Sequence, residues 1–451
     1  MALKERLQRM REGLDTPSSS SATTWTDAQP DAYHDIKAEL HRRLIDKLDL
    51  KTLEKLSTEE IRSELRSILS SIVSDSEVPL NRAERERMIQ ELIDEVTGLG
   101  PLEPLLRDSS ISDILVNTYS TVYIERRGQL SLTPVRFRDN DHLKQIINRI
   151  VSRVGRRIDE TSPMVDARLP DGSRVNAIIP PLAVDGALLS IRRFGETRLR
   201  IRDLMALGTL DPGMIGFLGA CVKAKVNMLV SGGTGTGKTT LLNALSVFIP
   251  ETERIVTIED AAELQLQQRH VVRLETRPPN IEGKGEVLAR ELVRNSLRMR
   301  PDRIIVGEVR SSEVLDMLQA MNTGHEGSLT TVHANSPRDA LIRLESMVGM
   351  SGIPLSENVT RQIISRGIQA VAHLTRGTDG RRRLTSISEI TGVEGPVITM
   401  QEIYKFEQTG VDDSGRLKGD FVPTGVRPHI MTRIEQFGID PAEVAEPYLG
   451  A

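Results

Sequence analysis

The chain has 451 residues, of which 38% are hydrophobic and 27% are charged, with only 7 Phe, 5 Tyr and 1 Trp. This composition is typical of two or three folded domains with cores of Leu, Ile and Val, and it excludes a small module or a disordered tail. Lys and Arg total 59 against 63 Asp and Glu, so no overall positive charge favours nucleic acid or an anionic membrane. The single cysteine, Cys221, excludes an internal disulfide and a Cys-ligated zinc site, and it agrees with a reducing compartment.

The first zone, residues 1–98, contains a tail and a set of helices. Residues 1–30 are charged at the start and then Ser/Thr-rich, and they lack the apolar core of a secretory signal, so we expect a flexible segment. From residue 31 to 98 the apolar residues recur at helical spacing, which predicts a helical bundle. Its last helix has Asn81 as a candidate N-cap, Glu84 in the capping-box position and Gly98 after the last apolar turn. The sequence contains no run of about 18 apolar residues, so we expect no membrane-spanning helix.

The second zone, residues 99–207, predicts a smaller mixed α/β domain. Short apolar strands alternate with Gly-containing turns, and one amphipathic helix interrupts them. The expected strands lie at 114–117, 121–125, 168–181 and 187–194, and the helix at 142–154.

The third zone, residues 208–451, alternates strand and helix. Its near-continuous apolar strands predict a mostly parallel sheet covered by helices on both faces. The expected strands lie at 226–232, 254–259, 302–308 and 328–333, and further strands follow at AVAHL, TSISEI and VITMQEIYKF.

A complete phosphate-binding loop follows the first of these strands. Its glycines let the backbone N–H groups converge on an anion, and the following helix adds the positive end of its dipole. Lys238 would reach the β- and γ-phosphates, and the Thr239 hydroxyl would bind Mg²⁺. The nucleotide-binding candidates are Gly232, Gly233, Thr234, Gly235, Thr236, Gly237, Lys238, Thr239 and Thr240.

Carboxylates end two neighbouring strands of the same zone. Glu308 follows the apolar run IIVG, as in a Walker B strand, where it could bind Mg²⁺ or polarise the attacking water. Glu259 and Asp260 end the strand TIED, the expected position of active-site groups in a parallel sheet. The pattern predicts an ATPase and leaves open which glutamate is the general base.

Two histidines, His325 and His333, flank the strand at 328–333. No cysteine cluster or H-E-x-x-H motif supports a transition-metal site, and Mg²⁺ prefers oxygen ligands. An imidazole that contacts the γ-phosphate fits better, while a structural role for one of the pair stays open.

Arginines present several alternatives. Arg290, Arg294 and Arg298 share one helix face, which could contact nucleic acid or another subunit, or be solvated. No interleaved aromatic residues support base stacking. On the strands and turns of the second zone, arginines could act as arginine fingers on a γ-phosphate or form salt bridges within the sheet. These candidates are Arg168, Arg174, Arg192 and Arg193.

The motifs together resemble those of the type II/type IV secretion ATPase superfamily. GGTGTGKTT, TIEDAAEL, RPDRIIVGEVR and TGHEGSLTTVHANSP occur in the order typical of that superfamily. PLEPLLRDSSISDILVN and ARLPDGSRVNAIIPPLAVDGALLSIRRF resemble the CpaF-like branch, which powers tight-adherence (Tad/Flp) pili. The resemblance covers residue 98 to the C-terminus. Ala261 replaces a proline found in many relatives, and the cysteine tetrad of many extension motors is absent, as in the CpaF-like branch.

The resemblance implies a homohexamer that binds ATP and Mg²⁺ between an N-terminal domain and a RecA-like P-loop domain. It implies that hydrolysis drives domain rotation, which acts on an inner-membrane platform protein to assemble or retract a pilus. The chain would therefore be cytoplasmic, at the inner face of the bacterial inner membrane, with no direct nucleic-acid partner. Glu259 and Glu308 would be the catalytic carboxylates, and His325 and His333 the histidine-box residues.

Other functions remain alternatives. A type IV secretion or DNA-translocating ATPase would share the ring and the loop, although the net charge disfavours a DNA pump. A nucleotide-gated scaffold would bind ATP with little turnover, against which the carboxylates argue. A GTPase is disfavoured because the chain has no N-K-x-D motif.

Overall fold

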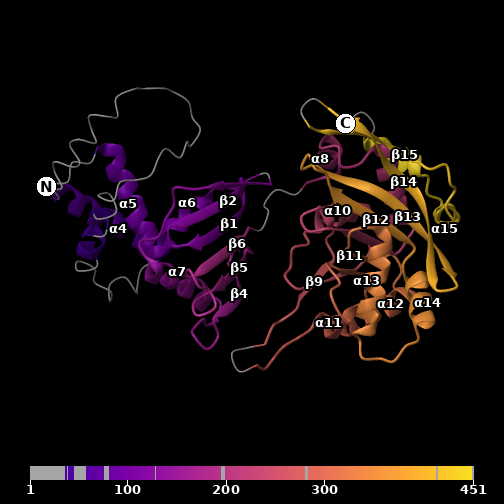
Figure 1. The fold of residues 1–451 in the computed structure, drawn as a ribbon, viewed down its shortest axis with the longest axis horizontal. Coiled ribbons are helices and arrows are strands. Elements are labelled where there is room, and N and C mark those ends of the chain that lie inside the picture. Colours follow the sequence, from indigo (N-terminus) through magenta and orange to yellow (C-terminus); the bar gives the residue numbers. More distant parts are fainter. Residues whose placement is uncertain are drawn as a thin grey trace. The chain divides into compact units, whose positions relative to one another are not determined.

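The computed structural model describes residues 36–37, 39–44, 57–75, 81–126, 128–193, 199–279, 283–412 and 415–448. The expected flexible segment, 1–30, lies outside these residues. The chain divides into two compact units, Met1–Glu196 and Thr197–Ala451 (Figure 1). The division comes before the expected boundary at residue 207, because helix α8 (Ile201–Ala206) places Ile201 and Leu204 in the core of the second unit.

The first unit begins with the expected helices. Helix α4 (Thr58–Asp75) and helix α5 (Arg82–Thr97) pack with a helical segment at 39–44 around buried Leu, Ile and Met side chains. The capping box is confirmed: the Asn81 side chain accepts from the Glu84 N–H at 2.9 Å, and the Glu84 carboxylate accepts from the Asn81 N–H at 2.7 Å. Two short turns, η1 (Gly100–Leu102) and α6 (Glu103–Arg107), lead into the sheet.

A six-stranded antiparallel sheet completes the first unit, in the order β3-β2-β1-β6-β5-β4. Helix α7 (Asn140–Arg153) covers one face, because Leu143, Ile147 and Ile150 lie on its apolar side and enter the core. The edge strand β3 follows a turn near residue 128 that the sequence predicts to lie between strands, although no range is predicted for this strand. The strands are β1 (Ile111–Thr118), β2 (Thr121–Arg126), β3 (Gln129–Leu132), β4 (Met164–Arg168), β5 (Arg174–Ile178) and β6 (Leu188–Arg192).

The second unit contains a nine-stranded sheet in the order β15-β14-β13-β12-β7-β11-β10-β8-β9. Strands β12, β7, β11, β10, β8 and β9 run parallel, as expected, and β13, β14 and β15 extend the sheet as antiparallel strands. The parallel strands are β7 (Met228–Gly232), β8 (Ile255–Glu259), β9 (Val271–Glu275), β10 (Arg303–Val306), β11 (Leu329–His333) and β12 (Ala370–Arg376). The others are β13 (Arg382–Glu394), β14 (Val397–Val411) and β15 (Leu417–Pro423).

Helices cover both faces of this sheet, so the second unit has the expected RecA-like three-layer α/β architecture (Figure 1). One core contains α9 (Pro212–Lys223), α10 (Lys238–Leu245), η2 (Ser246–Phe248), α15 (Ile430–Gln436) and α16 (Pro441–Ala445), which is followed by η3 (Glu446–Tyr448). The other contains α11 (Ala289–Ser296), α12 (Glu313–Asn322), α13 (Pro337–Gly349) and α14 (Glu357–Gly367). None of the described helices is long and apolar enough to cross a membrane.

Candidate active site

The parallel strands of the second unit bring their carboxyl ends to one edge of the sheet. Strand β7 ends in the phosphate loop, β11 ends at His333, β10 leads into Glu308 and β8 ends at Glu259. The register places His333 opposite Gly232 and Val306 opposite Ile258. Residues that are distant in the sequence therefore meet at the edge where parallel sheets bind ligands.

The phosphate loop has the backbone that its glycines predict. Gly232, Gly235 and Gly237 all have positive φ, and Gly237 precedes the first residue of α10. At Gly232 a Cβ would lie 2.5 Å from the carbonyl oxygen of Leu374 on β12, so a side chain is excluded by space as well as by conformation.

Lys238 lies folded over this loop. Its ammonium donates hydrogen bonds to the carbonyl oxygens of Gly232 at 3.0 Å and Gly233 at 2.9 Å. The Thr236 hydroxyl also donates to the Gly233 carbonyl, at 3.0 Å. The loop therefore holds its lysine at the position where an anion would be bound.

Glu308 lies between an arginine and a histidine. Its Oε2 accepts from Arg310 Nε at 2.8 Å, and its Oε1 lies 3.0 Å from His333 Nε2. Arg310 also reaches Asp260 Oδ2 with Nη1, at 2.9 Å. Arg310 thus links the carboxylates that follow β10 and β8. The sequence analysis did not single it out, even though it follows Glu308 by only two residues.

Glu259 is more deeply buried than Glu308. Its Oε2 accepts the N–H groups of Glu263 at 2.7 Å and Leu264 at 2.8 Å, while its Oε1 is buried with no hydrogen-bond partner among the described residues. Burial raises the pKa of this carboxyl above the usual range, and the two backbone N–H bonds oppose that shift. Its side chain packs against Gly307, where a Cβ would lie only 2.8 Å from Glu259 Cγ.

The two histidines occupy opposite ends of β11. Burial and the positive charge of Lys238 lower the pKa of His333, and the Glu308 carboxylate opposes them. His333 therefore lies near both Lys238 and Glu308. His325 lies before the first residue of β11, at the other edge of the sheet, so within one chain it does not join the site. Its carbonyl accepts the Ser328 hydroxyl at 2.7 Å, which is a structural contact.

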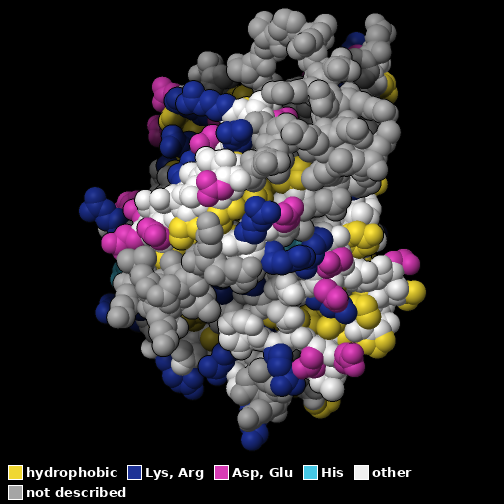
Figure 2. Space-filling view, turned by 90° about the vertical axis from the view of Figure 1, so that its left-hand side faces the viewer, with side chains coloured by type: hydrophobic (Ala, Val, Ile, Leu, Met, Phe, Trp, Pro, Cys, Tyr) yellow, Lys and Arg dark blue, Asp and Glu magenta, His cyan; other side chains and the backbone are white. Residues whose placement is uncertain are grey.

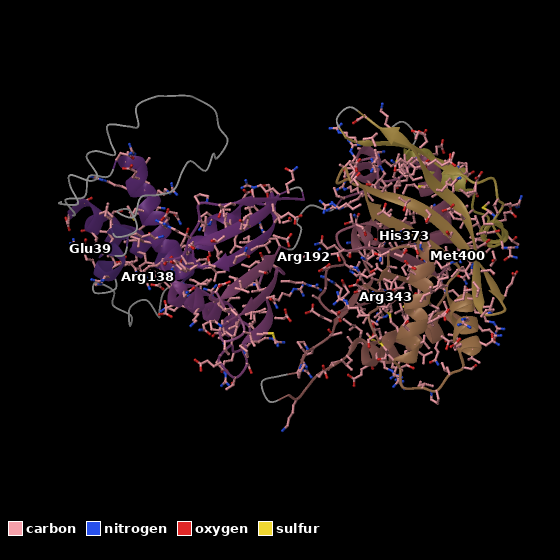
Figure 3. All side chains as sticks on the ribbon, viewed as in Figure 1. Glu39, Arg138, Arg192, Arg343, His373 and Met400 are labelled. Carbon is pink, nitrogen blue, oxygen red and sulfur yellow. The ribbon has the colours of Figure 1, made fainter. Side chains whose placement is uncertain are left out.

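A third histidine, His373 on β12, supports the loop from the other side and was not singled out from the sequence. Its Nδ1 lies 2.8 Å from the hydroxyl of Ser231, the residue before the loop (Figure 3). Its ring also hydrogen-bonds the backbone of Asn335, two residues after His333. His373 is buried and belongs to no motif of the sequence, so only its contacts in the folded chain identify it.

Three of the four arginine candidates in the first unit form one row. The pairing places Arg168 opposite Arg174 and Arg174 opposite Arg192, so they lie on adjacent strands of one face (Figure 3 labels Arg192). Arg192 is also opposite Asp113 on β1, but Arg168 and Arg174 face other arginines, an arrangement that is destabilising without an anion and makes the row a candidate anion contact. Arg193 does not belong to it, because its guanidinium donates to the Asp108 carbonyl and its N–H to the Ser112 carbonyl.

The arginine series on α11 makes contacts within the chain. Arg290 Nε and Arg294 Nε donate to the two carboxylate oxygens of Asp316 on α12, at 2.8 and 2.7 Å. Two of the three arginines of this face therefore share one carboxylate within the chain.

The donor set at the sheet edge fits Mg²⁺. Magnesium prefers oxygen ligands. It takes one or two of them from the protein and the rest from phosphates and water. Glu308 and the Thr239 hydroxyl at the start of α10 can supply them. Among the described residues no group of three or more His, Cys, Asp or Glu could hold a metal ion by itself.

Family comparisons agree with these features. The family described as "Type II/IV secretion system protein" matches residues 95–405. The "Type II secretion system protein E, N-terminal domain" matches residues 33–97, so the helical bundle also has relatives, which the sequence resemblance had not covered.

Individual proteins are similar over most of their length. A "Putative conjugal transfer protein" of Mycobacterium tuberculosis is 39% identical over 332 residues, which are 72% of this chain and 92% of that protein. The "Type IV secretion system protein PtlH" of Bordetella pertussis is 35% identical over 329 residues, 66% of this chain and 96% of that protein. A solved structure, the VirB11 ATPase of Brucella suis with sulphate, is 29% identical, with a TM-score of 0.35 over 64% of this chain and 95% of that chain.

Proposed function

The chain belongs to the type II/IV secretion system protein family, and from this premise we propose that it is an Mg²⁺-dependent ATPase that acts as the ring motor of such a system. The observation that supports the proposal is the meeting of Lys238, Glu308 and Glu259 at one sheet edge, with His333 between the lysine and Glu308. A phosphate cradle alone would serve a binding protein, whereas carboxylates beside it can prepare water for attack.

The residues at this edge have separate tasks in the proposed reaction. The loop backbone and Lys238 bind the β- and γ-phosphates, with Thr234, Thr236 and Thr240 in and beside the cradle. Thr239 and Glu308 would hold Mg²⁺, which would neutralise part of the phosphate charge when bound.

The two glutamates would then divide the handling of water. Glu308 orients the attacking water, and Arg310 and His333 fix the direction of its carboxylate. Glu259, whose pKa is raised by burial, can accept a proton and is the candidate general base.

We further propose a homohexamer that powers a tight-adherence pilus through an inner-membrane platform protein, as a cytoplasmic CpaF-like motor. The resemblance of residues 101–117, 122–130 and 167–194 to that branch supports this assignment. In such a ring Arg168, Arg174 and Arg192 would neutralise phosphate charge on bound nucleotide, and His325, at the far end of β11, would lie outside the site of its own chain.

A second candidate is the ATPase of a conjugal or type IV secretion system, which the relatives from Mycobacterium tuberculosis and Bordetella pertussis favour. Direct DNA pumping is the weaker form of this candidate. On the face drawn in Figure 2 the described Lys and Arg side chains are interspersed with Asp and Glu rather than gathered in one basic stripe. A salt-titrated gel shift tests DNA binding, and a pull-down of the membrane partner separates pilus from secretion machinery.

The decisive experiment measures steady-state ATP hydrolysis and mass together, with and without nucleotide. We expect Lys238→Ala to abolish nucleotide binding, because it removes the charge that the loop presents. Glu308→Gln should bind ATP but turn over at least about a hundredfold more slowly, because the water loses its orienting carboxylate. Wild-type turnover in Glu308→Gln would remove the Walker B assignment. A protein that neither hydrolyses ATP nor assembles would refute the motor.

A further inference from the structure

The turn between β12 and β13 lies over the phosphate loop and presents an arginine to it. Strand β12 pairs with β7 so that His373 lies opposite Ser231 and Leu374 opposite Gly232, and the chain then turns back through residues 377–381. Arg382, the first residue of β13, donates from Nε to the Gly235 carbonyl at 2.7 Å. A Cβ at Gly237 would lie 3.6 Å from Arg382 Cδ. The side chain therefore lies along the crest of the loop.

A buried ion pair fixes this turn. Asp379 accepts from both Nη groups of Arg383, at 3.1 and 2.7 Å, and from the N–H groups of Arg381 and Leu417, both at 3.1 Å. These bonds hold the pKa of Asp379 well below its usual range, so the carboxylate stays charged. The Arg383 guanidinium also lies over the Phe406 ring. Arg383 thus anchors the turn, and alternation along the strand directs Arg382 to the other side.

The donors of Arg382 are only partly used. Its Nε makes the bond to Gly235, and the structure records no hydrogen bond or ion pair for its Nη1 and Nη2 among the described residues. A guanidinium with two unused N–H groups beside a phosphate cradle has the geometry of a bidentate phosphate contact.

The order of the strands decides which phosphates it can reach. His333 and Glu308 lie on the β11 and β10 side of the loop, where the γ-phosphate must be if they handle the attacking water. Arg382 comes from the β12 and β13 side. The phosphate chain is linear, so that side faces its α- and β-phosphates. We infer that Arg382 is a further nucleotide-binding residue, supplied by the same chain, that contacts the phosphates common to ADP and ATP.

This inference rests on the proposed nucleotide site and predicts a division of labour within it. A contact to phosphates that ADP and ATP share stabilises ground state and transition state alike. Loss of Arg382 should therefore raise KM and leave kcat within about twofold, whereas loss of Glu308 should lower kcat.

The test measures the Kd of fluorescent ADP and of a non-hydrolysable ATP analogue for the full-length protein. We expect Arg382→Ala and Arg382→Gln to weaken both nucleotides equally, by about tenfold or more, as for loss of a charge-assisted hydrogen bond. Arg382→Lys, which keeps the charge but not the fork, should retain part of the affinity. Arg381→Ala is the matched control, because the Arg381 side chain lies next to Arg382 but has no recorded contact with the loop. It should bind both nucleotides as the wild type does.

Two results would overturn the inference. If Arg382→Gln binds ADP normally, an uncharged donor to Gly235 suffices and Arg382 only supports the loop. If ATP binding weakens while ADP binding does not, Arg382 contacts the γ-phosphate instead of the α- and β-phosphates. Melting of each variant without nucleotide separates a misfolded loop from a lost contact. Failure of the proposed function is distinct, because the wild-type protein itself would then bind neither nucleotide.

Discussion

Two glutamates at neighbouring strand ends have different surroundings. Glu308 lies between Arg310, which donates to its Oε2, and His333, whose Nε2 lies 3.0 Å from its Oε1. Glu259 is buried, with one oxygen bound by two backbone N–H groups and the other without a partner in the described part of the chain. Burial, rather than the charge of Glu308, is the main cause of its raised pKa. The same residue type is thus prepared for two tasks.

The raised pKa of Glu259 predicts a pH-dependent effect of Glu259→Gln on stability. A carboxyl whose pKa is higher in the folded than in the unfolded state stabilises the fold below the ordinary value of about 4.3. That contribution is lost as pH rises through the folded pKa. Gln cannot ionise, so the melting temperature of Glu259→Gln relative to the wild type should rise between pH 5 and pH 8, by on the order of 2–4 °C.

Nucleotide-free thermal melts at both pH values provide the measurement. Any packing cost of the amide is the same at each pH and cancels in the comparison. Glu402→Gln, at an exposed position on β14, is the control and should show no such trend. A difference for Glu259→Gln that stays constant with pH would mean that the carboxyl is not destabilised by burial.

At the scale of elements, the C-terminal segment packs on the helix that precedes the phosphate-loop strand. Helix α9 presents Gly216 and Gly219 to α16. A Cβ at Gly216 would lie 2.4 Å from the Pro441 carbonyl oxygen, and one at Gly219 would lie 2.7 Å from Val444 Cγ1. The Arg433 guanidinium on α15 adds a hydrogen bond to the Ala224 carbonyl at 2.7 Å. The small residues at Gly216 and Gly219 therefore let α15 and α16 pack closely on α9, at one face of the nine-stranded sheet.

Gly216→Ala should consequently destabilise the second unit. The atom that a new Cβ would meet is backbone, which cannot rotate away, so the cost should be about 1–3 kcal/mol. That corresponds to a fall in melting temperature of about 2–10 °C. Gly349→Ala at the end of α13 is the matched control, since a Cβ there meets nothing within 4 Å. Equal melting temperatures for the two variants would show that α16 does not pack on α9 in solution.

At the scale of the whole molecule, the candidate residues are distributed over two units. The second unit holds the phosphate loop and the carboxylates, and the first holds the row Arg168, Arg174 and Arg192 on the sheet face opposite α7. In a motor, hydrolysis in one domain must change the position of another. An arginine that contacts the phosphates only in the assembled site is one way to couple them.

We therefore expect Arg192→Ala to lower kcat of the assembled protein by at least about tenfold, with little change in ADP affinity, because an arginine finger acts mainly on transition-state charge. Asn176→Ala is the control: Asn176 lies on the same face, where its amide pairs with Asp166 at 3.0 Å. Turnover and mass are measured together, so that a lost assembly is not mistaken for a lost finger. Normal turnover in Arg192→Ala would exclude it from the reaction.

The sequence by itself determined the local elements and the class of chemistry. The phosphate loop, the acidic strand ends, the capping box of α5 and the parallel strands all follow from short-range patterns, because turns, caps and alternating burial depend on neighbouring residues. The family follows from the same motifs, and the comparisons confirm it at the level of type II/IV secretion proteins.

Only the tertiary structure decided which candidates meet. The length of β11 separates His325 from His333. Strand order brings His373 and Arg382 to the loop, although they are more than 130 residues away in the chain. Register gathers three arginines into a row and excludes Arg193, and Arg290 and Arg294 pair with Asp316 within the chain. Such juxtapositions depend on how non-local strands and helices pack, and no short-range pattern encodes that order.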